Sequence, residues 1–446
     1  MKLFIRGSFL ASLVLSLVSL AASQATTSNT FEAQAASVSE LSVNGLKVIV
    51  KRRASAPTVA GGLFIRGGAR NIDANDAGIE NLMLASAIEA GTKMPRATIR
   101  RELASLGSGI GSAVANDYSV VSFQSTRENF DRTWEILSAV MLDPAFARED
   151  VNINRERILA GLREAGQSPE SALQNLQDKT LYSGHPYAND VTGTTENISR
   201  FSPADLRAYH KKIMQTSRLL LVIVGDVDPV QLKARVASTF GKLPQGNYKE
   251  TSLPMLDFSK ATLNVTQRAL PTIYVQGSFR APALRDPDYY AMRVATAILA
   301  TLVYQEVRIN QQLSYAPDAD MNNLAANTAT ISVSSTDANR AVTAMLQQIS
   351  LLKERTLTDE MIDDIADFFL TRHYLTLETN AAQVGELARY ELIGGGWRHS
   401  FEFLNGVRSV KPEDIRDVAN KYMKNIRFAV VGNEALIKKS IFVPAD

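Results

Sequence analysis

Alternating hydrophobic and polar residues near the beginning of the folded region predict a β-hairpin. Leu41 to Lys51 holds two β-rich runs on either side of Asn44-Gly45, the dipeptide that most strongly indicates a two-residue hairpin turn. Val59 to Arg66 is a further predicted strand, and Ser119 to Ser125 alternates in the same way. The first part of the chain is therefore expected to contain a sheet.

Apolar residues at helical spacing predict four helices in the same region. They are Asp76 to Ala90, Ile99 to Leu106, Phe130 to Leu142 and Asp150 to Ala165, and the first two end at glycines. Strands and helices thus run in blocks rather than in strict alternation. This order favours an α+β fold, with helices on one face of a mostly antiparallel sheet, over a doubly wound parallel sheet.

A segment near the middle of the chain recurs near its end. Pro203-Ala204-Asp205-Leu206-Arg207 leads through Arg218 into a predicted strand that stops at Gly225. Pro412-Glu413-Asp414-Ile415-Arg416 leads through Arg427 into a predicted strand that stops at Gly432, and the offset stays constant from the prolines to these two arginines. The repeat predicts two homologous halves, each a mostly antiparallel sheet with helices packed on one face.

The repeat also divides the chain into segments. Residues 38–241 form the predicted N-terminal repeat and residues 262–446 the C-terminal repeat, and residues 242–261, rich in Pro, Gly and polar residues, link them into a clam-like chain. Residues 26–37 are rich in Ser, Thr and Ala and are expected to be a disordered lead-in. Residues 1–25 have the basic start, apolar core and small-residue end of a signal peptide.

Composition narrows the possible locations and ligands of the chain. Without the two basic residues of the signal peptide, basic and acidic residues are equal in number, so no charge excess favours nucleic acid. No later apolar run approaches the ~20 residues that a membrane span needs. The chain has no cysteine, which excludes disulfides and thiolate metal sites. An exported, cysteine-free chain indicates the bacterial periplasm, with secretion to the medium as the alternative.

The stretch Gly78-Ile79-Glu80-Asn81-Leu82-Met83-Leu84-Ala85 has the outline of a zinc-binding helix whose metal ligands are missing. In the pattern G-[IL]-x-H-x-x-E-H, the two histidines bind zinc from one helix face and the glutamate activates the metal-bound water. Asn81, Leu84 and Ala85 occupy those three positions. The helix therefore lacks the side chains that the zinc chemistry requires.

Further motifs occur in the same order as in a known family. His185-Pro186-Tyr187 with Gly193-Thr194 matches an H-P-Y…G-T segment, and Leu221-Val222-Ile223-Val224-Gly225-Asp226 matches the strand that ends the family's first half. With the helix outline, these segments resemble the pitrilysin/insulinase family of inverzincin peptidases. The resemblance covers essentially the whole mature chain. It is greatest to the two-repeat branch, which includes mitochondrial processing peptidase subunits and bacterial heterodimeric peptidases.

The resemblance places the family's third zinc ligand, a glutamate on a later helix, at Gly161. Since Asn81 is a poor zinc donor while Ala85 and Gly161 offer none, no site with three protein ligands is expected. The histidines, His185, His210, His373 and His399, show no ligand spacing. Glu80 and Glu89, which flank the degenerate ligand positions, are interpreted as solvated helix charges. No metal is expected in this chain.

The second half keeps a family motif. Arg308 and Tyr315 match the family's R…(G)L-x-Y segment, and the resemblance implies that this pair contacts the scissile region of the peptide. The chemistry is suitable, because an arginine presents a permanent cation to a peptide carbonyl. A tyrosine hydroxyl donates to the oxyanion of a tetrahedral intermediate, a contact worth ~3 kcal/mol.

The resemblance therefore implies a zinc-less subunit of a periplasmic heterodimeric metallopeptidase that is inactive alone. The expected partner is a homologous chain with an intact H-x-x-E-H helix, which would carry the zinc, and the expected substrates are peptides. The alternative is a non-enzymatic peptide-binding or assembly protein with a peptidase-like fold. A self-sufficient enzyme with a different metal site is disfavoured because the ligands are missing.

Overall fold

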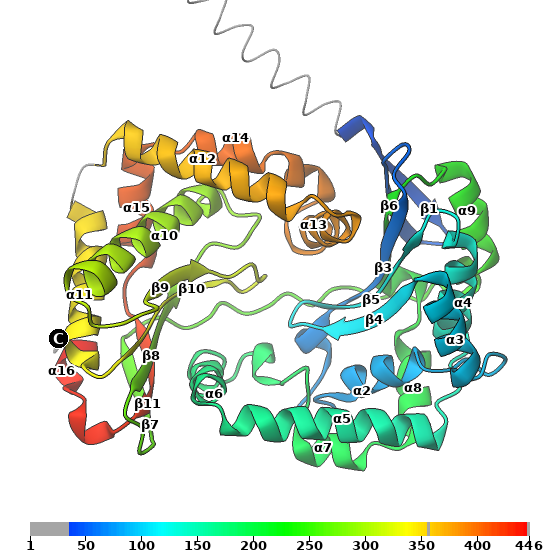
Figure 1. Cartoon of the computed structure of the whole chain (residues 1–446), viewed down its shortest axis with the longest axis horizontal. Coiled ribbons are helices and arrows are strands. Elements are labelled where there is room, and N and C mark those ends of the chain that lie inside the picture. The colour runs from blue at the N-terminus through cyan, green and yellow to red at the C-terminus, as the bar shows by residue number, and fades with distance from the viewer. Residues whose placement is uncertain (1–34, 355–356, 444–446) are drawn as a thin grey trace, which may run out of the picture.

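The computed structural model describes residues 35–354 and 357–443 and shows two halves side by side (Figure 1). The predicted signal peptide, residues 1–25, lies outside the described residues, as does most of the predicted lead-in, residues 26–37. Within the described ranges, no helix is long and apolar enough to cross a membrane.

The first half is built on a sheet with six strands among the described residues, in the order β1-β2-β6-β3-β5-β4. The strands are β1 Val38–Val43, β2 Leu46–Arg52, β3 Thr58–Arg66, β4 Gly109–Val114, β5 Tyr118–Thr126 and β6 Leu219–Gly225. The β1–β2 hairpin turns at Asn44 and Gly45, whose φ angles of 48° and 82° are those of a primed turn. The predicted hairpin is confirmed, whereas β4 was missed because its small residues show no alternation.

Helices of the first half pack mainly on one face of this sheet (Figure 1). They are α2 Ile79–Ala87, α3 Arg96–Leu106, α4 Phe130–Leu142, α5 Arg148–Gln167, α6 Pro169–Leu181, α7 Thr195–Arg200, α8 Pro203–Ile213 and α9 Pro229–Ser238. The bounds of α4 were predicted correctly. The predicted start of α2 at Asp76 was wrong, because Asp73 accepts hydrogen bonds from the backbone of Asn75 and Asp76 and holds a turn there.

The second half repeats this architecture. Its sheet, in the order β7-β11-β8-β10-β9, consists within the described ranges of β7 Thr262–Gln267, β8 Ile273–Arg280, β9 Asp318–Met321, β10 Thr328–Ser335 and β11 Arg427–Gly432. Its helices are α10 Tyr289–Val303, α11 Ala338–Glu354, α12 Asp359–Thr376, α13 Asn380–Ile393, α14 Phe403–Arg408, α15 Pro412–Tyr422 and α16 Lys439–Phe442. A π-helix, Tyr304–Asn310, continues α10.

Strand pairing confirms the predicted homology of the halves. β2 pairs in parallel with β6, which pairs antiparallel with β3, and β7, β11 and β8 repeat this arrangement. Their preceding helices, α8 and α15, begin alike: Asp205 accepts a hydrogen bond from the backbone N–H of Ser202 at 2.8 Å, and Asp414 accepts one from Lys411 at 2.9 Å. The α+β class with two homologous halves is therefore correct.

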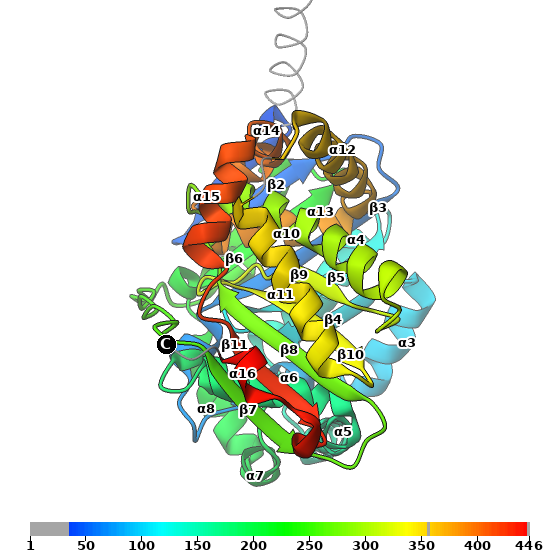
Figure 2. The ribbon, with the colours of Figure 1, turned by 90° about the vertical axis from the view of Figure 1, so that its left-hand side faces the viewer.

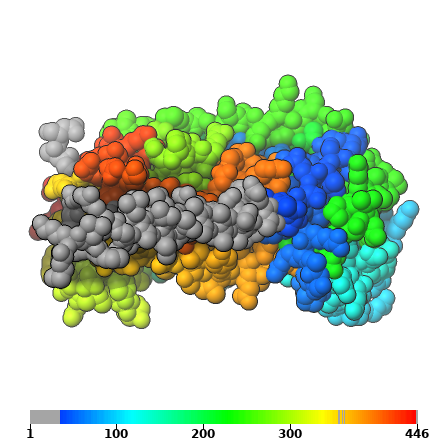
Figure 3. Space-filling view, turned by 90° about the horizontal axis from the view of Figure 1, so that it is seen from above, coloured from blue at the N-terminus to red at the C-terminus, as the bar shows by residue number. Residues whose placement is uncertain are grey.

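Each sheet is covered on its second face by a helix of the other half. Val384, Leu387 and Ala388 of α13 pack with Trp397 against apolar residues of β2, β3 and β6, and Figure 3 shows the orange residues around 380–410 against the blue N-terminal strands. In return, Leu173 of α6 packs against Ala429 and Val431 of β11. The two halves are thus held together by exchanged helices.

The segment between the halves is held by the two arginines of the repeat. Arg218 lies over the ring of Tyr248 at 5.2 Å, and Arg427 lies over the ring of Phe258 at 5.4 Å. Residues 243–261 contain no helix or strand. Each half therefore anchors one end of this extended segment through an equivalent cation–π contact.

A small polar cavity of about 270 Å³ lies between α6 and the strands β8, β9 and β10 of the second sheet. Asp178 of α6 lies in its wall and accepts a hydrogen bond from Gln174 at 2.9 Å. Burial, opposed by that hydrogen bond and assisted by the charge of Asp190, raises the pKa of Asp178 to about 6. Because the folded state favours the protonated carboxyl, this group's contribution to stability is greatest below pH 3.8 and is lost as the pH rises towards 6.

We expect Asp178→Asn to raise the free energy of unfolding by about 2 kcal/mol at pH 8, where the wild-type carboxyl is charged. At pH 3 the gain should be small, because that carboxyl is then mostly protonated in both states. Urea unfolding at the two pH values measures the difference. Asp318→Asn, at an exposed carboxyl of the same cavity, is the matched control. An equal gain at both pH values would contradict the assigned charge effect.

Candidate functional site

The degenerate ligand helix α2 is positioned by two glycines of the family motifs. Gly78 has a φ of 89°, and a Cβ atom there would lie 2.4 Å from the Cα atom of Gly193. Side chains at either glycine would therefore force α2 away from the turn that precedes α7. Asn81 fixes the same contact, since its side-chain amide donates to the carbonyl of Thr192 at 2.9 Å. Both motif glycines therefore have a structural role.

The four degenerate positions of the zinc site lie in three different environments. Leu84 is fully buried in the core of the first half, and Asn81 and Ala85 are half-buried on α2. Gly161 is exposed on α5, where a Cβ atom would meet no heavy atom within 4 Å. Within the described ranges, no group of His, Asp and Glu side chains could hold a metal ion. These residues do not fit the zinc that the fold family implies.

The interpretation of Glu80 and Glu89 as solvated charges was wrong. Glu80 is 5% exposed, accepts a hydrogen bond from the hydroxyl of Tyr209 at 2.8 Å and lies 3.6 Å from the guanidinium of Arg218. Glu89 accepts hydrogen bonds from Arg96 at 2.9 Å and Arg100 at 3.1 Å. Both carboxylates therefore fasten α2 and its C-terminal end to other elements of the first half.

The four histidines make separate structural contacts. A ring nitrogen of His185 lies 3.2 Å from the carbonyl of Pro254, and one of His210 lies 2.9 Å from the carbonyl of Met141. His373 stacks on Phe403, and His399 lies 2.8 Å from a carboxylate oxygen of Glu402. Burial lowers the pKa of both His185 and His210, which favours their neutral forms.

The structure brings Arg308 and Tyr315 together. The guanidinium of Arg308, on the π-helix, lies 4.0 Å from the centre of the Tyr315 ring and 5.1 Å from that of Tyr304, and it donates to the carbonyl of Tyr315 at 2.8 Å. Glu306 fixes the following turn by accepting from the side chains of Asn310 and Gln311. The Tyr315 side chain nevertheless remains 79% exposed. Arg308 and Tyr315 thus form a braced pair that faces solvent, and their catalytic role stays a prediction.

The pair and α2 lie far apart within the chain. The π-helix packs on α10 and α11, at the far left of Figure 1, whereas α2 lies in the opposite half. The outer helical layer of the second half therefore carries Arg308 and Tyr315. A site that combines this pair with an H-x-x-E-H helix would need that helix from another molecule.

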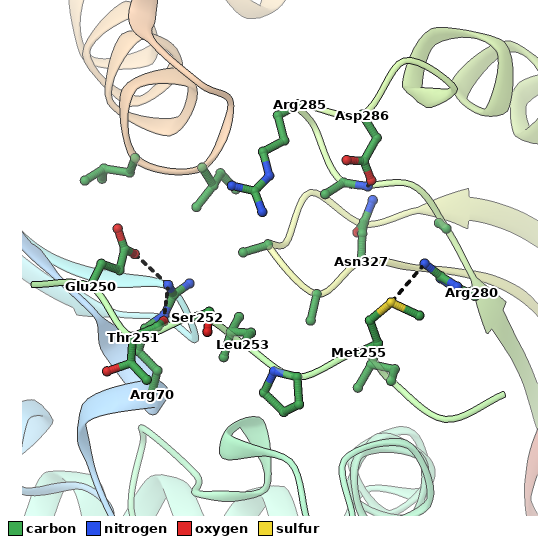
Figure 4. A pocket seen from close by; sticks show the side chains of 18 residues that line it. Arg70, Glu250, Thr251, Ser252, Leu253, Met255, Arg280, Arg285, Asp286 and Asn327 are labelled. Atoms are coloured by element: carbon green, nitrogen blue, oxygen red, sulfur yellow. Dashed lines mark hydrogen bonds and ion pairs between the residues drawn. The ribbon is translucent and has the colours of Figure 1, made fainter.

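A cavity of about 500 Å³ lies between the halves and is closed on one side by residues 250–256 (Figure 4). Arg70 binds Glu250 at 2.7 Å and Asp117 at 3.0 Å, and the side chain of Arg285 points into the cavity from the second half. Met255 accepts a long hydrogen bond from Arg280. The wall thus combines the Arg70–Glu250 ion pair and further charged side chains with apolar loop residues.

Asp117 joins this cavity wall to the H-P-Y motif. One carboxylate oxygen accepts from the hydroxyl of Tyr187 at 2.5 Å, and the other accepts from the backbone N–H of Ala325, in the second half, at 3.0 Å. Burial, together with the charge of Asp117, raises the pKa of Tyr187 far above its usual value. Through Asp117, Tyr187 therefore links the first half to the backbone of the second half. Sequence reasoning missed Asp117, although the H-P-Y match was a signal for its partner.

Two family models cover most of the chain. The model described as Insulinase (Peptidase family M16) matches residues 47–195, and that described as Peptidase M16 inactive domain matches residues 200–367. The chain belongs to peptidase family M16. α2 lies in the part that the Insulinase model matches, and the inactive-domain model matches the chain after it. The fold and family that the motifs predicted are both confirmed.

Named relatives of this M16 chain share less than a quarter of its residues. Bovine mitochondrial cytochrome b-c1 complex subunit 1 is 24% identical over 57% of this chain, which spans about half (54%) of that protein. A Helicobacter pylori protein named non-peptidase homolog is 21% identical over 83% of this chain and 88% of its own length. The crystal structure of a peptidase M16 inactive domain from Pseudomonas fluorescens superposes with a TM-score of 0.81 at 20% identity, covering 89% of this chain and 98% of that one.

We expect Glu80→Gln to lower the free energy of unfolding by about 3 kcal/mol, because it leaves Arg218 as a buried cation without its carboxylate. Glu89→Gln is the matched control: it removes the same charge from a site with more exposed arginines, and its loss should stay near ~1 kcal/mol. Chemical denaturation of both variants at pH 7 provides the measurement. Equal, small losses would show that the Glu80–Arg218 pair does not hold α2.

Proposed function

We propose that this chain is the zinc-less subunit of a heterodimeric M16 metallopeptidase that degrades or processes peptides. One observation carries the proposal: Arg308 and Tyr315 are braced and solvent-facing on the second half, while α2 of the same chain has no metal ligands. A homologous subunit with an intact H-x-x-E-H helix would supply the zinc. This chain would supply the arginine, the tyrosine and part of the peptide-binding surface.

The chemistry of Arg308 and Tyr315 suits a site that is shared with a zinc-bearing subunit. Arg308 is a permanent cation whose position is fixed by Tyr315, Tyr304 and a backbone carbonyl, so little side-chain entropy remains to be lost on binding. The exposed Tyr315 side chain gives its hydroxyl access to a substrate from another molecule. In a shared site, Arg308 would orient a peptide carbonyl and Tyr315 would donate to the oxyanion that forms from it.

Location is a separate part of the proposal. The basic start, apolar core and small-residue end of residues 1–25 support export, and the absence of cysteine is compatible with the periplasm. Periplasmic fractionation of cells that produce the full chain, with and without residues 2–25, tests this part independently of any activity.

A non-enzymatic role is the second candidate, and the name of the Helicobacter pylori relative, non-peptidase homolog, favours it. In that case the chain would bind peptides or another subunit without contributing to hydrolysis. Peptide binding without turnover, in every combination with zinc-bearing homologues, would decide for this alternative.

The proposal predicts that mixing the chain with its H-x-x-E-H homologue produces peptidase activity that neither chain has alone. In the mixture, Tyr315→Phe should lower kcat roughly 100-fold, the usual effect of removing one oxyanion donor, and Arg308→Ala should lower kcat/KM. Tyr374→Phe, at another exposed tyrosine, is the control and should leave both constants unchanged. A fluorogenic peptide assay measures the rates.

Size-exclusion chromatography of each mixture separates assembly from chemistry. If the variants assemble normally and retain full activity, the roles of Arg308 and Tyr315 are wrong. If the wild-type mixture assembles but hydrolyses no peptide, the heterodimeric peptidase itself is refuted.

A further inference from the structure

The second sheet has a free edge where the first sheet has a strand. β2 lies between β1 and β6, whereas its counterpart β7 pairs, among the described residues, with β11 alone. Since the two sheets otherwise share one strand order, the repeat leaves the position equivalent to β1 without a strand. An unpaired strand edge offers backbone donors and acceptors to another chain.

The helix beneath that position also differs between the halves. After β6, α9 packs under β1, and its residues Leu232 and Val236 share a core with Val43. After β11 the described residues form a single 3-10 turn, Glu434–Leu436, and the short α16, Lys439–Phe442, which lies beside β7 and β11 (Figure 2). A cavity of about 920 Å³ adjoins β7 at this place. The described part of the second half thus lacks both the strand and the full helix that fill this region in the first half.

The cavity combines an apolar floor with a cationic rim. Leu263 and Val265 of β7 line it together with apolar residues of α11, β11 and α16, which are Leu346, Ile349, Phe428, Ile441 and Phe442. Four lysines, Lys260, Lys353, Lys424 and Lys439, surround this floor. Lys439 binds Glu434 at 3.0 Å, but none of the other three forms an ion pair with a described residue. Burial and the charge of Lys424 lower the pKa of Lys353, so a nearby anion would stabilise its charged form.

Alternate residues of β7 direct their backbone N–H groups towards the free edge of the sheet. The N–H groups of Thr262 and Arg268 donate to carbonyls of Ile426 and Gly432, towards β11. Because backbone groups alternate in direction along a strand, the N–H groups of Leu263 and Val265 point to the free side. Their side chains lie on the face that adjoins the cavity. A strand added here would bond to β7 and place alternate side chains in the cavity.

We propose that β7 and this cavity bind an extended, acidic segment of another polypeptide chain, which completes the second sheet as β1 completes the first. Main-chain bonding to β7 supplies the affinity, and the lysine rim selects acidic residues at the exposed positions. This docking surface is separate from Arg308 and Tyr315 and does not depend on the proposed peptidase activity.

A labelled peptide tests the proposal with the full chain. The probe has the sequence of residues 37–44 with Ser39→Glu and Ser42→Glu, and the control probe carries lysine at all of its acidic positions. Fluorescence polarisation should show binding of the acidic probe alone, weakening as salt rises. The double variant Lys353→Glu/Lys424→Glu should bind it at least about tenfold more weakly.

A proline substitution in β7 tests the backbone hydrogen bonds separately from the lysine rim. Val265→Pro removes an N–H that faces the free side but none that pairs with β11, so it should weaken binding about tenfold, whereas Val265→Ala should change it less than about twofold. Equal binding of both probes, or unchanged binding by Val265→Pro and the lysine double variant, would overturn the proposal. Binding that appears only after residues 444–446 are deleted would assign the groove to the chain's own end and would also overturn it.

Discussion

The structure depends on the exchange of two helices between its halves. β6 is buried at all seven of its residues, so apolar layers must cover both faces of the first sheet. The helices of the first half cover one face, and α13 of the second half covers the other. In the opposite direction, α6 leaves the first half to pack on β11. Neither half therefore completes its own layers, and separating them would expose apolar surface on both.

This exchange constrains where a functional site can lie. α6, the turn at Asp117 and the segment around Tyr187 lie at the contact between the halves, where Asp117 already binds Tyr187, Ala325 and Arg70. Arg308 and Tyr315 lie instead on the outer side of the second half, where a cation–π contact and a hydrogen bond hold them against each other. Arg308 and Tyr315 therefore face away from the first half, which lies on the other side of the second sheet (Figure 1).

Local signals in the sequence predicted the elements that local chemistry determines. Asn44-Gly45 specified the first hairpin, the periodicity of Phe130 to Leu142 gave both ends of α4, and the repeat gave the equivalence of α8 and α15. Glu80 was misjudged because its burial depends on Tyr209 and Arg218, which are distant in sequence. The contact that Asp117 makes between the halves was missed for the same reason. Its partner, the backbone of Ala325, belongs to the other half and carries no side-chain signal. The contact of Arg308 with Tyr315 was accessible only through resemblance to a family.

The burial of Leu84 explains why α2 keeps its place after losing every zinc ligand. The motif glycines Gly78 and Gly193 set the close approach of α2 to the rest of the half, and this approach needs no metal. At the position of the family's catalytic glutamate, Leu84 is fully buried, which contributes about 2 kcal/mol of apolar burial. An ionised carboxylate at that position, with no metal or cation beside it, would instead be a buried unpaired charge. α2 is thus a core helix, and restoring the glutamate at Leu84 alone would destabilise it.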